Sequence, residues 1–336
     1  MAESSRLTVS SYIIRITLLL SITVITAIAG LLIGPVNIGF SEFYSAVFTS
    51  QGNEAISQII FDIRLPRVLY AIAVGGGLSI AGAVFQALLM NPLAEPYILG
   101  ISSGGTFGAV LSFLIGASLF TTQLFAFAGA LCVMMLVFIL GKRFGELEPN
   151  VLLLSGVMVG AFFSAAILLM MGLLNNSLRT AVFWLIGNLS IADKNSIVYV
   201  VPVTIIVSII LILQSNKYNI LSLGIENAKQ LGLNTTFVRN STYILTSLMI
   251  GVLVSVSGII GFVGLLVPHV CRMIFGVDNR VVVPASFFIG AAYLTFADTI
   301  ARSLISPAEL PVGAVTALIG APVFIYLLRK RFKVIN

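Results

Sequence analysis

Residues 64–105 read RLPRVLYAIAVGGGLSIAGAVFQALLMNPLAEPYILGISSGG: an apolar run, a polar break and the start of a second apolar run. A helix of about 20 apolar residues can cross a bilayer, and the first run is long enough. Pro92 and Pro96 cannot continue a hydrogen-bonded helix, whereas Asn91 and Glu95 suit helix ends. Backbone groups freed by such a break need water or protein around them. We therefore predict two spanning helices joined by a turn, with an ordinary surface turn as the alternative.

The whole chain has the composition of a multi-span membrane protein. Hydrophobic residues make up 59% of its 336 residues and charged residues 9%, and the mean hydropathy is +1.11. Soluble domains carry about 25% charged residues. The apolar runs are long and continuous rather than alternating, which favours helices over a membrane β-barrel. We predict an all-α membrane protein that forms a single transmembrane domain over residues 1–336.

The apolar runs predict about ten spans: 13–33, 66–90, 97–116, 122–141, 151–174, 196–214, 241–260, a short one at 265–277, 283–303 and 312–329. Lys and Arg concentrate on the cytoplasmic side of membrane proteins. With a cytoplasmic N-terminus most basic residues fall inside, and few fall outside: Arg64, Arg67, Arg179, Lys194 and Arg302. Both termini are therefore predicted to be cytoplasmic, as is the turn at residues 90–100.

An internal repeat is indicated by small residues and a proline that recur at one constant offset. The pairs are Gly75 and Gly251, Ser79 and Ser255, Gly82 and Gly258, Pro92 and Pro268, and Gly100 and Gly276. The predicted topology makes the halves, about 60–175 and 240–333, run in opposite directions. Inverted repeats of this kind place a substrate pathway at the interface between the halves. Other glycines favour close helix packing, as in any membrane bundle: Gly75 to Gly77, Gly104 with Gly108, and Gly156 with Gly160.

The sequence offers little for catalysis, metal binding or nucleic-acid binding. Cys132 and Cys271 lie in apolar runs without metal-ligand spacing, and His269 is the only histidine. A nucleotide-binding GxxxxGK[ST] motif is absent. The basic residues sit at helix ends, which gives no nucleic-acid surface. We expect no catalytic site, no metal and no cofactor in this chain, and interpret His269 as a packing or hydrogen-bonding residue.

The longest polar segment on the predicted cytoplasmic side is residues 216–240, NKYNILSLGIENAKQLGLNTTFVRN. Within it, residues 225–231 predict a short helix ended by Gly232. Its apolar side chains share one face: Ile225, Ala228 and Leu231. The polar ones face elsewhere: Glu226, Lys229 and Gln230. So short a helix needs a partner surface, which we predict to be a soluble protein, with the bilayer surface as the alternative.

Residues 226–232, ENAKQLG, are similar to the loop by which ABC importer permeases contact their ATPases. The stretches 64–105, 261–280, 297–304 and 309–329 resemble the FecCD family of permeases for iron–siderophore, haem and cobalamin uptake. The resemblance implies a ten-helix subunit in the bacterial cytoplasmic (inner) membrane. It also implies partners: a second permease copy or close homologue, two ABC ATPase subunits that bind ATP and Mg²⁺, an extracytoplasmic binding protein and membrane lipid.

The same resemblance implies roles for individual residues. For docking of the binding protein it points to Arg64, Arg67 and Arg302, for which interfacial snorkelling is the alternative. For the inner gate and the pathway it points to Asn91, Leu93, Pro149, Asn150, Ser155, Gly160 and Ser164. For ATPase coupling it points to Ile225, Glu226, Ala228, Leu231 and Gly232. Proline at position 149 departs from the small polar residue of the vitamin B12 members.

These observations predict the permease subunit of an ATP-driven importer for an iron chelate, with a siderophore first and haem or cobalamin next. The alternative is an ion-coupled secondary transporter, which needs an intramembrane group to carry the ion. Asp298 is the one acid deep in a predicted span, and such a carboxylate is a candidate functional group. Its spacing to Arg302 indicates an i,i+4 ion pair as the simpler interpretation.

Overall fold

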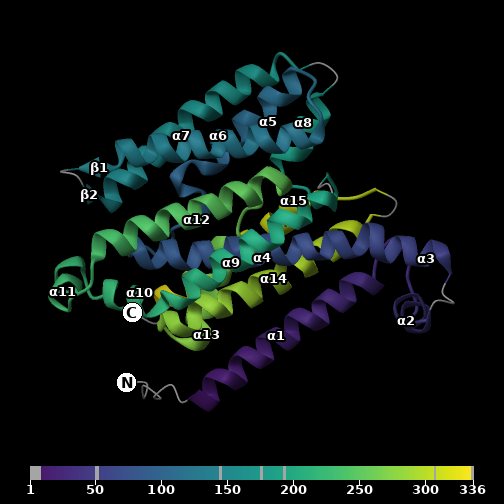
Figure 1. Ribbon diagram of the computed structural model, residues 1–336, viewed down its shortest axis with the longest axis horizontal. Coiled ribbons are helices and arrows are strands. Elements are labelled where there is room, and N and C mark those ends of the chain that lie inside the picture. The colour runs from purple at the N-terminus through teal and green to yellow at the C-terminus, as the bar shows by residue number, and fades with distance from the viewer. Residues whose placement is uncertain are drawn as a thin grey trace.

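The computed structural model describes residues 9–49, 53–143, 146–174, 177–191, 194–305 and 308–333. Most of these residues lie in helices that run roughly along one long axis (Figure 1). The first half of the chain contains α1 (Val9–Leu32), α2 (Phe40–Phe48), α3 (Glu54–Gln58), α4 (Leu65–Leu88), α5 (Ile101–Leu114), α6 (Leu119–Leu140) and α7 (Pro149–Met171). The second half contains α8 (Leu178–Leu185), α9 (Ile197–Leu213), α10 (Ser215–Leu221), α11 (Ile225–Gln230), α12 (Thr235–Ser257), α13 (Val263–Phe275), α14 (Asn279–Ser303) and α15 (Val312–Lys333).

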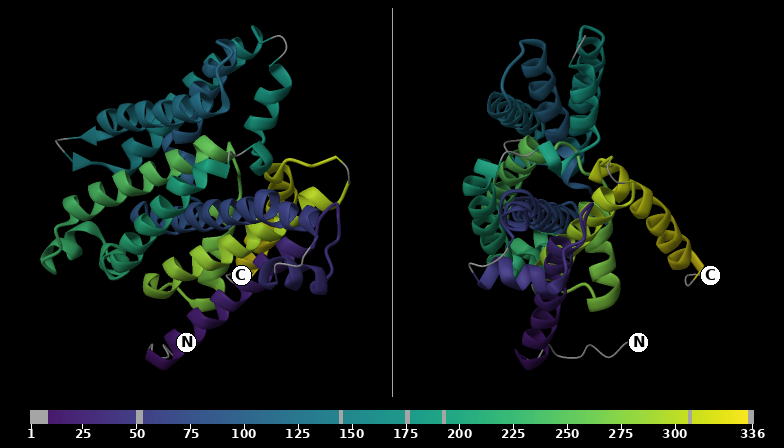
Figure 2. Two further views of the ribbon diagram at one scale, coloured as in Figure 1. Left: turned by 45° about the vertical axis from the view of Figure 1, so that its right-hand side comes forward. Right: turned by 90° about the vertical axis from the view of Figure 1, so that its right-hand side faces the viewer.

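Helix α4 forms the centre of the bundle and is buried along almost its whole length. It packs against α9, α12, α13 and α14, and it is seen end-on near the middle of the bundle in the right-hand view of Figure 2. Glycines let the backbone of α4 come close to the backbones of neighbouring helices. A Cβ atom at Gly75 would collide with the carbonyl oxygen of Gly290, and one at Gly82 with that of Gly264. The close packing predicted at Gly75 is confirmed.

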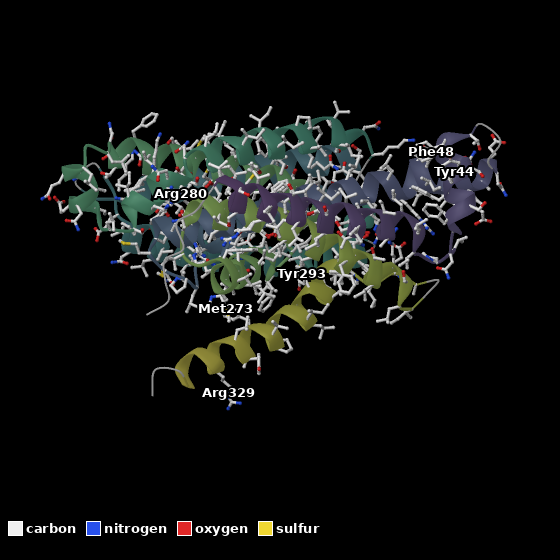
Figure 3. The ribbon with its side chains drawn as sticks, turned by 90° about the horizontal axis from the view of Figure 1, so that it is seen from below. Tyr44, Phe48, Met273, Arg280, Tyr293 and Arg329 are labelled. Atoms are coloured by element: carbon white, nitrogen blue, oxygen red, sulfur yellow. The ribbon has the colours of Figure 1, made fainter. Side chains whose placement is uncertain are left out.

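The two ends of the bundle are built from different short elements. At one, the α11 end, lie α10, α11 and the hairpin of β1 (Lys142–Arg143) and β2 (Glu146–Leu147) (Figure 1). At the other, the α3 end, lie α2, α3 and α8. Figure 3 shows Arg280 and Met273 toward the α11 end and Tyr44 and Phe48 at the α3 end. Helix α1 begins on the α11 side (Figure 1), and Arg329 of α15 lies toward the same end (Figure 3).

Seven helices among the described residues are long and apolar enough to cross a membrane. They coincide with seven of the ten predicted spans, and the first of the long internal ones extends back to Glu54. The other three predicted spans coincide with shorter apolar helices: α5, α13 and the described apolar part of α15. The prediction of a multi-span helical protein is therefore confirmed.

Two of the short helices, α5 and α13, follow non-helical segments that contact each other. The 3₁₀ turn η2 (Pro96–Leu99) precedes α5, and residues 258–262 precede α13. The hydroxyl of Tyr97 accepts a hydrogen bond from the Ile260 amide (3.2 Å) and donates one to the Ile260 carbonyl (3.3 Å). Such contacts satisfy backbone groups that a lipid environment could not.

Several elements were not expected from the sequence. The π-helical stretch η1 (Ile59–Arg64) joins α3 to α4, and α2 and α10 are short helices outside the predicted spans. The two-residue strands β1 and β2 pair antiparallel as a small hairpin in an otherwise all-helical fold. The 3₁₀ turns η3 (Leu189–Ile191) and η4 (Lys194–Ser196) link α8 to α9. These segments are too short or too polar to give a continuous apolar signal.

Two residue pairs of the predicted repeat do not occupy matching places. Pro92 lies in the turn after α4, whereas Pro268 lies inside α13. Gly100 precedes α5, and Gly276 follows α13. The order of elements is nevertheless similar in both halves: a long helix, a short one and two more helices, α4–α7 and α12–α15. Because α4 begins at the α3 end and α12 at the α11 end, these two helices run in opposite directions (Figure 1).

Candidate functional site

Helix α11 lies at the outer surface of the α11 end as a short, separate helix. Gly224 (φ +101°) precedes it, and Gly232 (φ +81°) follows it, as a C-terminal glycine should. The side chain of Glu226 is 84% exposed, and its ion pair with Lys229 is long, at 3.8 Å. Leu231 is 64% exposed directly after the helix. The predicted helix and its terminating glycine are therefore present.

Ala228 faces the protein itself rather than outward. It is fully buried, and its carbonyl accepts a hydrogen bond from the Leu233 amide (3.0 Å). Ile225 is half-buried. The predicted apolar face is thus divided, because Ala228 anchors α11 to the body while Leu231 remains outside. A partner at this surface would contact Leu231 and Glu226 but not Ala228.

The exposed surface around α11 contains more apolar area than the sequence indicated. Leu223 precedes α11, and Phe237 projects from the first turn of α12; both side chains are more than half exposed. We call Leu223, Glu226, Leu231 and Phe237 the coupling surface. Exposed apolar side chains beside charged ones are typical of a protein contact.

Helix α10 links the coupling surface to the start of α14 through Asn219. Its Nδ2 donates to Oδ1 of Asp278 (2.7 Å), and its Oδ1 accepts from the Asn279 amide (2.8 Å). Asp278 also caps α14 by accepting from the Arg280 amide (2.9 Å). The hydrogen bonds of Arg280 and Asn219 hold the pKa of Asp278 below its ordinary value. A displacement of α10 and α11 would therefore pull on α14.

The predicted inner-gate residues lie in the turn after α4 and at the start of α7. The Oδ1 atom of Asn91 accepts from the Leu93 amide (2.9 Å), so this side chain shapes the turn. Leu93 is half exposed. Pro149 is the first residue of α7, where its missing amide hydrogen costs no helical bond, and Asn150 beside it is exposed.

The predicted pathway helix α7 is the outermost of the α5–α7 layer (Figure 1). Gly156 is buried, and a Cβ there would collide with the Ile98 carbonyl oxygen. Ser155 and Gly160 are partly buried, whereas Ser164 is exposed. The small residues therefore do not share one open face. Much of the exposed α7 surface is apolar, with Leu154, Met158 and Phe162 prominent.

A buried ion cluster lies toward the α3 end, where α4 begins and α14 ends. Nε of Arg67 contacts both carboxylate oxygens of Asp298 (2.9 and 3.0 Å), and Nη1 of Arg67 contacts Oε2 of Glu309 (2.7 Å). Nε of Arg302 lies 3.7 Å from Oδ2 of Asp298. Asp298 is 1% exposed. The predicted Asp298–Arg302 pair is present, but Arg67 is the closer partner.

The remaining contacts of the arginines hold the end of α1. Arg64 donates to the carbonyl oxygens of Leu31 (2.6 Å), Leu32 (2.8 Å) and Val36. Arg302 donates to the carbonyl of Gly30. The last carbonyls of a helix lack helical partners, and cations there are favourable. These arginines therefore fasten α1 to η1 and α14.

Docking of a binding protein on Arg64, Arg67 and Arg302 stays a prediction, and the structure shows what these arginines contact within the chain. All three are buried, with 7% exposure or less, and bond to groups of this chain. Burial of a cation requires such partners, which is the physical reason for the arrangement. The resemblance implied no role for Glu309, which lies 242 residues from Arg67 along the chain.

The accessible charged groups at the α3 end include Asp62, Lys194 and Glu309. Asp62 and Lys194 form an exposed ion pair (2.9 Å). Together with Arg67 and Tyr70 they line a groove of about 520 Å³. Lys194 was expected on the outside, but Asp62 and Glu309 were not singled out. The signal that could have identified Asp62 and Glu309 is that both are acidic residues close to the predicted external basic residues.

The remaining candidate groups are the possible metal ligands, His269 and the two cysteines. Within the described ranges, no cluster of three His, Cys, Asp or Glu side chains could hold a metal ion. The ring of His269 packs edge-on against Phe324 of α15 (5.6 Å between centroids), in line with the packing role expected for it. Cys271 is buried and Cys132 is exposed, and neither forms a disulfide.

The fold and these sites define a multi-pass membrane permease, with a coupling surface at one end and a buried ion cluster toward the other. The model of the FecCD transport family matches residues 22–330. The chain is 40% identical to the vitamin B12 import system permease protein BtuC of Salmonella newport, over 81% of this chain and 83% of that protein. It is 36% identical to the hemin transport system permease protein HmuU of Yersinia pestis, over 90% and 92%.

A solved structure described as an inward-facing conformation of a metal-chelate type ABC transporter is also similar. It superposes with a TM-score of 0.83 at 33% identity and covers 95% of this chain and all of that one. Because the family model matches nearly the whole chain, the chain belongs to the FecCD transport family. The resemblance found in the sequence is thereby confirmed.

Proposed function

We propose that this chain is the translocation subunit of an ATP-driven importer for an iron chelate. The observation that carries the proposal is the coupling surface: a separate helix at one end of the bundle, with exposed Leu223, Leu231 and Phe237 around it. Because the sequence has no nucleotide-binding motif, an ATP-driven cycle would need another protein to hydrolyse ATP. ATP and Mg²⁺ would be bound by two ATPase partners, and this chain would need no cofactor.

The coupling surface would be gripped from the cytoplasm. Closure of the ATPases would move α11, and Asn219 would transmit the movement from α10 to Asp278 and Asn279 at the start of α14. Helix α14 packs against α4 along much of its length. The pull would thus reach the centre of the bundle and the turn that contains Asn91 and Leu93.

A loaded extracytoplasmic binding protein would dock on the α3 end. The groove of Asp62, Lys194 and Glu309 offers both signs of charge at the surface. Charged contacts of this kind speed docking and weaken with salt. The buried arginines would support this end by holding α1 and Glu309 in place.

In the membrane we propose ten spans with both termini cytoplasmic, and pairing with a second permease copy or a close homologue. The three short apolar helices α5, α13 and α15 complete the count beyond the seven long ones. Support for the orientation comes from the shared position of α11, the start of α1 and Arg329 of α15 at one end (Figures 1 and 3). Helix α15 stands away from the rest of the bundle (Figures 2 and 3), so its outward side is open to a second subunit.

As the transported substrate we propose an iron–siderophore chelate first, and haem or cobalamin next. Relatives named for hemin and vitamin B12 support a large chelate or corrinoid. Small and apolar residues on α7 suit a wide passage without specific ligands. Selection among cargoes would then fall to the binding protein.

The test is reconstitution of the purified chain in liposomes with the co-expressed ATPase and binding protein from the same source. ATP hydrolysis is measured with ferric siderophores, haem and cobalamin in turn. The proposal predicts stimulation by one chelate and uptake that depends on ATP. Uptake that continues with an ATPase-dead partner and needs an ion gradient would overturn it.

A further inference from the structure

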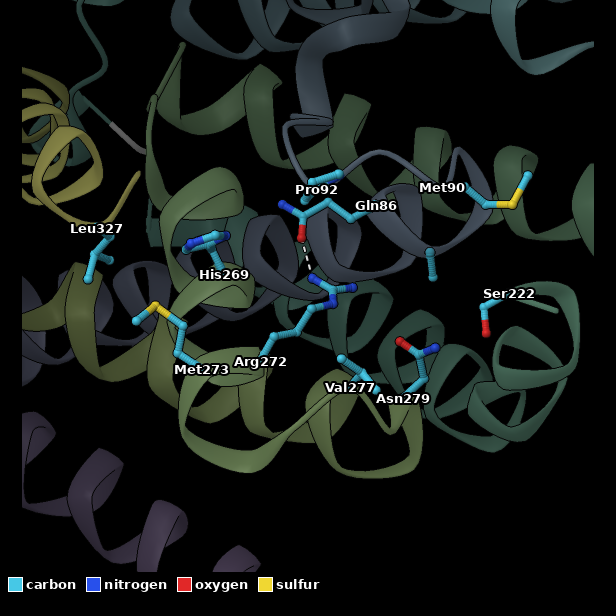
Figure 4. A pocket seen from close by; sticks show the side chains of 11 residues that line it. Gln86, Met90, Pro92, Ser222, His269, Arg272, Met273, Val277, Asn279 and Leu327 are labelled. Atoms are coloured by element: carbon cyan, nitrogen blue, oxygen red, sulfur yellow. Dashed lines mark hydrogen bonds between the residues drawn. The ribbon is translucent and has the colours of Figure 1, made fainter. Parts of the chain in front are cut away.

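A pocket of about 740 Å³ lies at the α11 end, and the functions described above assign no ligand to it. It lies between α4, α10, α13, α14 and α15, on the other side of the bundle from the α7 layer (Figure 1). Figure 4 shows Gln86 and Pro92 on one side of the space and Arg272, Val277 and Asn279 on the other. Most of its lining is apolar, and Arg272 is its one formally charged side chain.

Arg272 lacks a counter-ion in the described part of the chain. Its Nη1 donates to Oε1 of Gln86, and its Nη2 donates to the carbonyl oxygen of Ala83 (3.0 Å). Both acceptors are neutral, and no ion pair with Arg272 is found among the described residues. A guanidinium that is largely withdrawn from water without a carboxylate is costly. An anion in the pocket would relieve that cost.

A second group in the pocket is incompletely satisfied. Asn279 is 4% exposed, and its Oδ1 has no hydrogen-bond partner. Its backbone amide is already used by Asn219. A buried amide oxygen of this kind calls for a donor. The pocket thus offers one site for negative charge and one acceptor for a hydroxyl or amine hydrogen.

The mouth of the pocket is apolar and exposed. Met90, Met273 and Val277 all line the pocket, and each is more than half exposed. Beside a bilayer, such a mouth is suited to acyl chains rather than to a water-soluble anion. Basic pockets between helices near the cytoplasmic surface are suited to lipid head groups.

We propose that this pocket binds an anionic phospholipid whose phosphate diester carries a hydroxylated head group, as in phosphatidylglycerol. The phosphate contacts Arg272, a head-group hydroxyl donates to Oδ1 of Asn279, and the acyl chains leave past Met273 and Val277. Binding to the folded chain stabilises it by mass action.

The test uses the full-length chain purified in detergent and titrated with short-chain lipids of equal acyl length. The midpoint of thermal unfolding is followed with phosphatidylglycerol, phosphatidic acid and phosphatidylcholine, and with inorganic phosphate and glycerol 3-phosphate. We expect a saturable rise with phosphatidylglycerol and little effect of phosphatidylcholine or of the soluble phosphates. An equal rise with phosphatidylcholine, or with inorganic phosphate alone, overturns the proposal.

Variants locate the site. Arg272→Gln should weaken the apparent affinity for phosphatidylglycerol roughly tenfold or more, because charge-assisted hydrogen bonds are lost. Arg280→Gln, at an exposed arginine that pairs with Asp278, is the matched control and should leave the affinity unchanged. Asn279→Ala should abolish the preference for phosphatidylglycerol over phosphatidic acid. Unchanged affinity in Arg272→Gln contradicts the proposal; if that variant does not fold, Arg272→Lys replaces it, and the wild-type lipid comparison still decides.

Discussion

At the scale of single residues, Asp298 shows how a buried charge acquires its role. It lies between Arg67 of α4 and Arg302 of its own helix and is almost inaccessible. An ion-coupled transporter would need a carboxylate that exchanges its ion during the cycle. A carboxylate held by two arginines instead connects helices.

The first prediction concerns this carboxylate. Asp298→Asn leaves Arg67 and Arg302 buried with less compensation, and removal of one partner of a buried pair costs about 3–5 kcal/mol. We expect a clear fall in the midpoint of thermal unfolding of the purified chain. Asp62→Asn is the control, because its exposed pair with Lys194 contributes at most about 1 kcal/mol. Equal stability of the two variants would refute the structural role of Asp298.

The second prediction concerns pH and Asp278. Because its pKa is lowered in the folded state, its charge contributes stability above the unfolded value of about 3.9, and this stability is lost as pH falls through the folded pKa. The difference in unfolding midpoint between the wild type and Asp278→Asn should therefore stay constant from about pH 8 to pH 5 and shrink in stronger acid. A difference that changes between pH 6 and pH 8 would contradict this assignment.

Much at this scale could be predicted from the sequence, but long-range pairing could not. The Asp298–Arg302 spacing is local, so the pair was visible in the sequence. The contact of Arg67 with Asp298 joins residues 231 positions apart, and only the fold brings them together. For the same reason the contacts that bury the arginines of the α3 end could not be predicted from the sequence.

At the scale of elements, the packing of α4 depends on positions that tolerate no side chain. The third prediction is that Gly82→Ala destabilises the chain, because the new Cβ would meet the backbone of Gly264 in α13. Overpacking of this kind costs about 1–3 kcal/mol. The measurement is the unfolding midpoint, with Gly261→Ala as the control, since nothing lies within 4 Å of a Cβ there.

If Gly82→Ala and Gly261→Ala were equally stable, the close approach of α4 and α13 would be wrong. The glycines themselves were recognisable in the sequence as packing positions. Which helix each one meets was not, because spacing along one helix carries no information about the partner. Short elements such as α2 and α10 were missed because they lack a long apolar run.

The fourth prediction concerns the link between α10 and α14. Asn219→Ala removes two hydrogen bonds, each with a net contribution of about 1 kcal/mol. We expect membrane insertion and ATPase binding to persist while transport per ATP hydrolysed falls. Asn240→Ala on α12 serves as the control. Transport that is fully coupled in Asn219→Ala would exclude this route.

At the scale of the whole molecule, the protein has two ends that contain different candidate sites. The α11 end contains the coupling surface, and the α3 end contains the charged groove and the ion cluster beneath it. The multi-span class and the family were both predictable, the class from continuous apolar runs and the family from long motifs. The pocket around Arg272 was not predictable, because its lining runs from Gln86 to Leu327 and only the fold brings these parts of the chain together.

The central claim is that the coupling surface is held by a separate ATPase, and co-purification of that ATPase tests it most directly. Leu231→Asp places a charge at an exposed position outside the body of the chain and should abolish co-purification while leaving membrane insertion normal. Leu173→Asp, at an equally exposed leucine after α7, should retain the ATPase. Retention of the ATPase by Leu231→Asp at the wild-type level would contradict the account.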